Sequence, residues 1–237
     1  MNEFIYTFFV LLLAAFVQGS VGFGVALIAV PLMSLYLPPD QSIPLMSLLA
    51  ATLSFVMLLR YRQAFNWRAT VRLTAGSLFG IPLGVFLLRQ IEGDLIINIL
   101  GVIVIAYALY ALSNMRLPEL KRPFFGYIFG FFGGILSGAY NTGGPPVIIY
   151  GNCRRWEPSA FKGNLQGYFL INSSLVILTH WAMGNYSPLI LQRYLYAVPA
   201  VFLGLAMGFW LDGRLNPVLF RKLVLILLLV LGAALLT

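Results

Sequence analysis

Two glycine-rich stretches hold most of the residues in this chain that could bind a ligand. The first is Gln18-Gly19-Ser20-Val21-Gly22-Phe23-Gly24, and the second runs over 137–146 as Ser-Gly-Ala-Tyr-Asn-Thr-Gly-Gly-Pro-Pro. Glycine loosens a helix and proline removes a backbone donor, so each stretch is expected to interrupt a helix. A helix that restarts after such a break presents unpaired amides and the positive end of its dipole, which attract anions.

The neutral hydrogen-bonding groups beside these breaks suit a transported anion, because a buried full positive charge would hold an anion too tightly for release. The predicted substrate-binding residues are Gln18, Ser20, Gly22, Gly24, Ser137, Asn141, Thr142, Gly143, Gly144, Pro145, Asn164 and Gln166. The alternative is that the glycines only allow helices to pack closely. Two breaks at corresponding places in the chain favour a binding site over packing alone.

Other polar residues carry weaker signals. Lys162 either attracts substrate at a helix start or extends its amine to the lipid headgroups. Asn172, Ser173 and Ser174 are predicted to face the interior of the bundle, and His180 to lie at the membrane interface.

The sequence argues against an enzyme, a metal site or a cofactor. It has one histidine and one cysteine, Cys153, and its acidic residues fall at the ends of apolar segments or in loops. Metal-dependent hydrolases need clustered His, Asp or Glu ligands, and Ser137 has no evident base to activate it as a nucleophile. No GxxxxGK[ST] motif for binding nucleotide phosphates occurs.

The elements that must position the two breaks are membrane-spanning helices. Hydrophobic residues make up 60% of the 237 residues and charged residues 9%, against about 25% charged in soluble domains. The mean hydropathy is +0.91. Long apolar runs without alternation predict an all-α, polytopic transmembrane bundle. The predicted apolar segments are 4–37, 42–59, 69–88, 95–113, 124–151, 160–180, 194–211 and 218–236. The net charge of +8 sits in short loops, which does not favour nucleic-acid binding.

The chain also repeats itself. Gly76, Gly80 and Gly84 are matched 124 residues later by Ala200, Gly204 and Gly208, a spacing typical of close helix packing. Ala15, Gly19 and Gly24 are matched 119 residues later by Gly134, Gly138 and Gly143. We therefore predict two four-segment transmembrane repeats, 1–115 and 122–237, joined by a linker at 116–121.

The distribution of Lys and Arg predicts how the repeats are oriented. If all eight segments cross once, the basic residues divide almost evenly between the two faces. If segment 124–151 enters and returns as a hairpin, all of them except Arg89 and Arg193 lie on one face, as the positive-inside rule favours. Only the repeat argues that 4–37 is a hairpin too. With both hairpins the repeats are inverted, and both termini lie outside.

The motif over 18–24 followed by Val30-Pro31, together with Gly138-xx-Asn141-Thr142-Gly143-Gly144-Pro145-Pro146, resembles the TauE/SafE sulfite exporter family, which includes transporters like 4-toluene sulfonate uptake permeases. The resemblance covers essentially the whole chain. It implies a multi-pass protein of the prokaryotic inner membrane that exports small sulfur-containing anions such as sulfite, sulfoacetate or other organosulfonates. We expect alternating access around a midplane site, with an anion channel or an importer as the alternatives. The implied partners are the anion and the lipid bilayer, and a homodimer is left open.

Overall fold

The chain folds as a bundle of helices in the computed structural model, which describes residues 2–91, 93–113, 117–212, 214 and 216–236. No strand occurs among these residues, and the predicted all-α class is confirmed. Five helices in the described part are long and apolar enough to cross a membrane by length and composition: α1, α3, α4, α5 and α9. Arg116, in the predicted linker, lies outside the described residues.

The helices fall into two runs, and in each run the second helix is the shortest α-helix. The first run is α1 (Asn2–Val21), α2 (Val25–Ser34), α3 (Pro39–Tyr61) with a 3₁₀ turn η1 (Arg62–Ala64), α4 (Trp67–Gln90) and α5 (Gly93–Leu112). The second run is α6 (Phe125–Tyr140), α7 (Gly144–Cys153), α8 (Pro158–Ala182), α9 (Pro188–Leu211) and α10 (Pro217–Ala234). Each run therefore opens with a helix, a break and a helix of ten residues.

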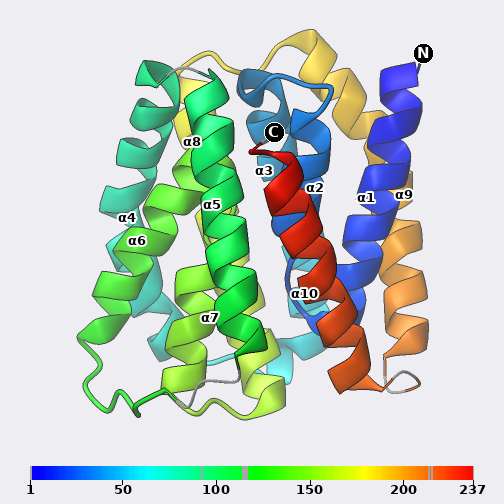
Figure 1. Ribbon diagram of the computed structural model, residues 1–237. Helices are drawn as coiled ribbons and strands as arrows, with labels where there is room; N and C mark the ends of the chain where they lie inside the picture. Colours follow the sequence, from blue (N-terminus) through cyan, green and yellow to red (C-terminus); the bar gives the residue numbers. More distant parts are fainter. Residues whose placement is uncertain (1, 92, 114–116, 213, 215, 237) are drawn as a thin grey trace.

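The two breaks fall where the sequence predicts them. Gly22 and Gly24 have φ of 94° and 109°, a left-handed conformation that costs little only for glycine. The second break begins at Asn141, also left-handed with φ 52°, whose amide donates to the Ser137 carbonyl at 2.8 Å and ends α6. In Figure 1 the chain turns back at both breaks, so α2 returns alongside α1, and α7 alongside α6.

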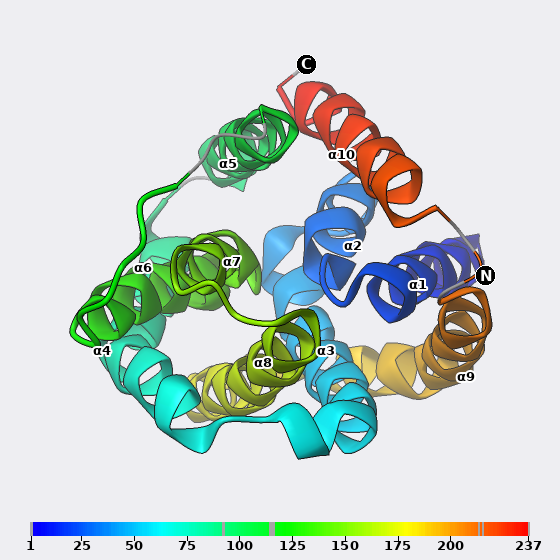
Figure 2. The ribbon, with the colours of Figure 1, turned by 90° about the horizontal axis from the view of Figure 1, so that it is seen from below.

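Helices from the two runs alternate through the bundle. α1 packs along α9 and α4 along α6, with α3 against α8 and α5 against α10. Figure 2 shows the α1–α9 and α4–α6 pairs on opposite sides, with α2, α3, α7 and α8 between them. Each pair takes one helix from each run, so the core between them is made jointly.

The glycine ladders are packing surfaces, as predicted. A Cβ atom added to Gly80 or Gly84 would lie 2.2 Å from the carbonyl oxygen of Phe131 or Ile135 on α6. The same clash, at 2.4 Å, would occur between a Cβ on Gly204 and the Leu12 carbonyl of α1. Only glycine lets these backbones approach so closely.

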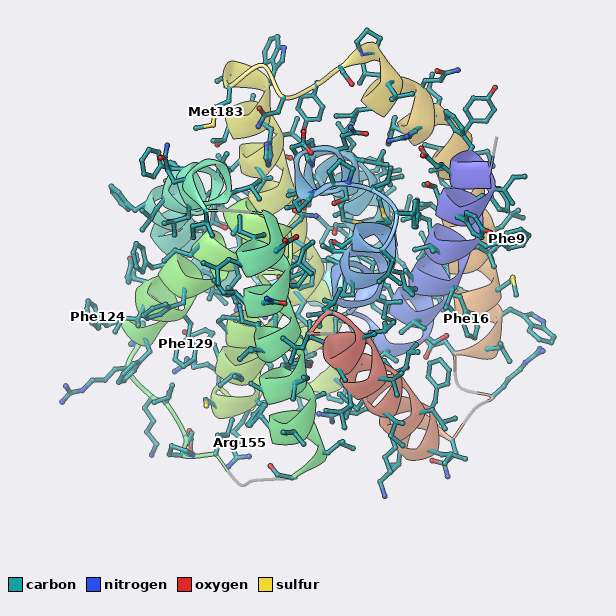
Figure 3. All side chains as sticks on the ribbon, turned by 45° about the horizontal axis from the view of Figure 1, so that its top comes forward. Phe9, Phe16, Phe124, Phe129, Arg155 and Met183 are labelled. Atoms are coloured by element: carbon teal, nitrogen blue, oxygen red, sulfur yellow. The ribbon has the colours of Figure 1, made fainter. Side chains whose placement is uncertain are left out.

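The ends of the bundle differ in charge. Both termini lie at the upper end in Figure 1. The lower end holds η1, the start of α6, the end of α9 and the start of α10. Figure 3 places Arg155 at the lower end and Met183 at the upper end. The described basic residues carried by the lower connections and helix ends are Arg60, Arg62, Arg68, Arg72, Lys121, Arg122, Arg154, Arg155, Lys162, Arg214, Arg221 and Lys222. The face that meets the cytoplasm stays a prediction.

One prediction about α8 needs correction, and the membrane depth of His180 stays a prediction. Asn172 and Ser173 are buried, at 2% and 4% exposure, but Ser174 is exposed and donates to the Leu170 carbonyl at 2.8 Å. One further residue on a helix turns the side chain by about 100°, which carries Ser174 away from the interior. His180 lies in the last turn of α8, but it is fully buried, and its Nδ1 is hydrogen-bonded to the Asn185 amide at 2.7 Å.

Candidate functional site

The two helix breaks meet at one internal cavity of about 40 Å³. A cavity of about 10–15 Å³ already holds a water molecule, so this one has room for a small polar guest. Its walls come from both breaks and from the middle of α3 and α8. The lining residues are Gln18, Phe23, Gly24, Val25, Ala26, Leu27, Ala50, Ser54, Ser137, Asn141, Thr142, Gly143, Gly144, Ile148, Phe169, Asn172 and Ser173.

The first break contributes backbone donors. The Val25 amide donates to the Gln18 Oε1 atom at 3.0 Å, and the first bond inside α2 runs from the Ile28 amide to the Gly24 carbonyl at 3.1 Å. The amides of Ala26 and Leu27 lie between these two and have no acceptor within the helix. The positive end of α2 therefore faces the cavity with two amides open to a ligand.

The second break contributes side-chain donors instead. Pro145 and Pro146 occupy the first turn of α7 and carry no N–H group, so few backbone donors remain there. The polar side chains of Asn141 and Thr142 stand in their place, at 8% and 2% exposure. The two breaks are therefore not equivalent, although the repeat predicts equivalent sites. The double proline already shows the difference in the sequence.

Four buried polar atoms in the lining have no hydrogen-bond partner. They are Ser54 Oγ, Asn141 Nδ2, Thr142 Oγ1 and Asn172 Oδ1. Leaving such a group unpaired costs about 1–3 kcal/mol, and most buried polar groups are paired for that reason. Their gathering around one cavity indicates that the cavity receives a polar ligand. Asn172 also donates through Nδ2 to Ser137 Oγ, which fixes its side chain at the wall.

The electrostatics of the cavity come from dipoles alone. No charged side chain of the described residues lines it, so a bound anion would be held by amides, hydroxyls and two helix N-termini. No lining side chain titrates near neutral pH. Outside the spans, burial raises the pKa of Tyr186 to about 12, partly offset by its hydrogen bond to Ser47.

A glutamine pair holds the first break in shape. Gln166 of α8 donates through Nε2 to the Gly22 carbonyl at 2.7 Å, and its Oε1 accepts from Gln18 Nε2 at 3.4 Å. Both glutamines are fully buried, at 0% and 1% exposure. Gln18 in turn caps the Val25 amide, so α8 supports the start of α2 through one connected network.

The structure brings together seven of the predicted site residues and separates five. Those lining the cavity are Gln18, Gly24, Ser137, Asn141, Thr142, Gly143 and Gly144. Ser20, Gly22, Pro145, Asn164 and Gln166 do not line it. Ser20 donates to the Phe16 carbonyl at 3.0 Å, and Asn164 accepts from the Asn66 amide at 2.7 Å. Asn164 and Gln166 support neighbouring backbone, and the binding roles of all twelve residues stay predictions.

Several lining residues are not among the predicted substrate-binding residues, although Asn172 and Ser173 were expected to face the interior of the bundle. Ser54 on α3 and Ser173 on α8 are 119 residues apart, and so are Ala50 and Phe169. This offset also relates Gln18 to Ser137 and Gly24 to Gly143. Applying the offset of the breaks to the mid-span positions of α3 and α8 would have found these residues.

Lys162 lies outside this cavity. Its amine is 3.4 Å from the Asp212 carboxylate and donates to the Tyr61 hydroxyl at 3.4 Å. Its stem packs against the first break, where a Cβ on Gly22 would lie 3.0 Å from Lys162 Cγ. Lys162 therefore extends to a carboxylate at the basic end of the bundle.

Comparison with known proteins adds an independent line of evidence. The family described as "Sulfite exporter TauE/SafE" matches residues 7–235. The chain is 26% identical over 224 residues to a protein of Cupriavidus necator named "Probable sulfite/organosulfonate exporter TauE", covering 92% of this chain and 88% of that protein. It is 24% identical over 179 residues to the "Probable inner membrane transporter protein TsaS" of Comamonas testosteroni, covering 75% of this chain and 74% of that protein. No solved structure matches.

The match spans both helix breaks, the cavity they enclose and every helix of the bundle. An exporter is a membrane transporter and not an enzyme, which agrees with the composition, the apolar helices and the predicted absence of catalysis. The chain belongs to the TauE/SafE family of membrane transporters.

Proposed function

We propose that this protein exports small sulfur-containing oxyanions, such as sulfite or organosulfonates, across the prokaryotic inner membrane by alternating access. The observation that carries the proposal is the set of unpaired donors around the cavity, in a member of a sulfite exporter family. The two relatives are named for sulfite and organosulfonate export and for inner-membrane transport.

The donor set fits an oxyanion. Asn141 Nδ2, the Thr142 and Ser54 hydroxyls and the amides of Ala26 and Leu27 are five donors, enough to give each of the three oxygens of a sulfite or sulfonate group at least one hydrogen bond. Hydrogen bonds to a charged group are worth about 1.5–3 kcal/mol each, so several of them can select a sulfonate group without a cation. Neutral donors also leave no strong ion pair to break on release.

The proposed mechanism uses two inverted four-segment repeats, 1–115 and 122–237, joined by the linker at 116–121. It is supported by the constant offset between lining residues and by the opposite starting ends of α1 and α6 in Figure 1. Repeats of this kind rock against each other around a fixed midplane site. The site proposed here lies where the repeats meet.

A flux assay in proteoliposomes tests the proposal. Proteoliposomes loaded with sulfite or sulfoacetate should release the anion in a saturable manner. Proteoliposomes loaded with acetate should release it no faster than vesicles that contain no protein. Asn141→Gly keeps a residue suited to positive φ but removes the donor, so sulfite release should fall about 10- to 100-fold. Wild-type protein that is folded but moves no sulfur anion would overturn the substrate class.

The same vesicles separate the alternatives. Unitary currents in planar bilayers would indicate a channel, because a carrier moves too few ions for such currents. Accumulation of sulfite against its gradient only in the inward direction would indicate an importer.

A further inference from the structure

Two grooves at the basic end of the bundle adjoin each other and lead towards the cavity. One, of about 430 Å³, is lined by Tyr110, Ala111, Leu117, Asn152, Arg155, Trp156 and Arg221. The other, of about 410 Å³, is lined by Ser20, Val21, Phe23, Ile148, Asn152, Trp156, Pro158, Phe161, Lys162, Asp212, Phe220 and Arg221. They share Asn152, Trp156 and Arg221, so we treat them as one space, the inner vestibule.

The inner vestibule and the cavity share two wall residues. Phe23 and Ile148 line both spaces, with Phe23 from the first break and Ile148 from α7. Phe23 is 7% exposed and its ring packs edge-to-face on Tyr107 at 6.4 Å between centroids. An anion in the inner vestibule is therefore one side-chain layer away from the donors at the helix breaks.

The inner vestibule carries uncompensated positive charge. Asp212 pairs with Lys162, but no carboxylate of the described residues lies within ion-pair distance of Arg155 or Arg221. Arg155 donates one bond to the Leu117 carbonyl at 3.0 Å, and its other guanidinium donors remain for a ligand. Arg221 is exposed, and its guanidinium group makes no hydrogen bond or ion pair with the described residues.

We infer that the inner vestibule is a second anion-binding site, which takes up sulfonate or sulfite through Arg155 and Arg221 before it passes Phe23 into the cavity. The inference rests on the proposed function. Guanidinium groups bind oxyanions through paired N–H donors. The two sites have different roles. The exposed charges of the vestibule attract the anion from water, and the neutral donors of the cavity bind it without the strong ion pair that a buried charge would form.

Intrinsic fluorescence of Trp156, which lines both grooves, measures this binding directly. Protein in phosphatidylcholine nanodiscs is titrated with sodium sulfite, and the change in emission should saturate. Trp156→Phe should remove that change, which assigns the signal to this side chain. Arg155→Gln with Arg221→Gln should raise the half-saturating sulfite concentration about 5- to 20-fold, since each exposed charge contributes a factor of a few.

The matched control is Arg68→Gln, an exposed arginine at the start of α4, at the same end of the bundle but outside the vestibule. It removes the same kind of charge and should leave the half-saturating concentration within a factor of two. An equal shift in Arg68→Gln and in the double variant, or no shift in either, overturns the inference. Transport should show the same pattern, with a higher KM and an unchanged maximal rate in the double variant.

Two further arms separate this site from the cavity and from lipid. Asn141→Gly should lower transport about 10- to 100-fold but keep the Trp156 signal, because Asn141 lines the cavity and not the inner vestibule. Wild-type protein that transports sulfite but shows no sulfite-dependent change in Trp156 emission would disprove the vestibule site and leave the proposed function standing. Phosphate headgroups present the same chemistry, so nanodiscs containing phosphatidylglycerol form the last arm: sulfite binding that persists supports the inference, and binding that is abolished assigns the groove to lipid.

Discussion

At the scale of single residues, the cavity holds polar groups that the fold leaves without partners. Ser54, Asn141, Thr142 and Asn172 are buried, yet each keeps one unpaired polar atom at the cavity wall. Such groups cost stability in the empty protein and become favourable only when a ligand satisfies them. A residue that serves binding can thus be distinguished from one that serves folding.

Thr142→Val tests this distinction. The change keeps the size of the side chain and removes the unpaired hydroxyl, so sulfite transport should fall about tenfold while the melting temperature stays the same or rises. Flux and a thermal melt in detergent measure the two effects. Ser174→Ala is the control, because this hydroxyl is exposed on the same bundle and should affect neither. A large drop in melting temperature for Thr142→Val would assign the residue to folding.

At the scale of elements, the glycine ladders set how closely the two runs of helices approach. α4 and α9 carry the ladders, and α6 and α1 receive them. Because carbonyl oxygens lie where a Cβ would be, even the smallest side chain must push these helices apart. The helices that carry the breaks are therefore positioned by residues remote from the cavity.

Gly80→Val should prevent correct packing of α4 on α6. Its Cβ would overlap the Phe131 carbonyl, and separating the helices should cost more than about 3 kcal/mol. The yield of monodisperse protein in size-exclusion chromatography should drop sharply. Leu78→Val lies on the exposed side of the same helix and should leave the yield unchanged. A normal yield for Gly80→Val would show that α4 and α6 are not in this contact.

At the scale of the whole molecule, the bundle separates charge from the site. Most of the described basic residues lie at one end, and none of them lines the cavity, which shares Phe23 and Ile148 with the inner vestibule. This arrangement lets the protein attract an anion from water without fixing it. It also predicts that Phe23 and Ile148, which line both spaces, limit the size of the anion that can pass.

Phe23→Ala should relax that limit on size. Loss of the ring leaves a gap between the inner vestibule and the cavity, so larger organosulfonates such as 4-toluenesulfonate should enter faster relative to sulfite. Competition assays in proteoliposomes measure this ratio. Phe132→Ala removes an exposed ring of α6 and serves as the control. An unchanged ratio in Phe23→Ala would mean that the ring does not limit passage.

The orientation of the bundle can be measured by cysteine labelling. In a Cys153→Ala background, Arg122→Cys and Arg214→Cys should both react with an impermeant maleimide only from the cytoplasmic face. Asp40→Cys, in the first turn of α3, should react only from the opposite face. Labelling of positions 122 and 214 from opposite faces would rule out the inverted arrangement of the repeats.

The sequence by itself determined the class of the fold and the location of the breaks. Composition requires a membrane bundle because so few charged residues cannot cover a soluble surface. The glycines of 18–24, and the glycines with Pro145 and Pro146 of 137–146, disfavour a continuous helix through each stretch. The glycine ladders were also readable, because small residues at this spacing have one main use in membrane helices. These features depend on residue types and their spacing within one segment, which can be read from the sequence.

Only the tertiary structure decided which of these residues share one cavity. Gln166 and Asn164 look like ligands in the sequence but support backbone instead, while Ser54 and Asn172 arrive at the cavity from other helices. Whether a buried polar group finds a partner depends on neighbours more than 100 residues away, as between Gln18 and Gln166. Pairing is a property of the packed bundle, so no single segment could reveal it.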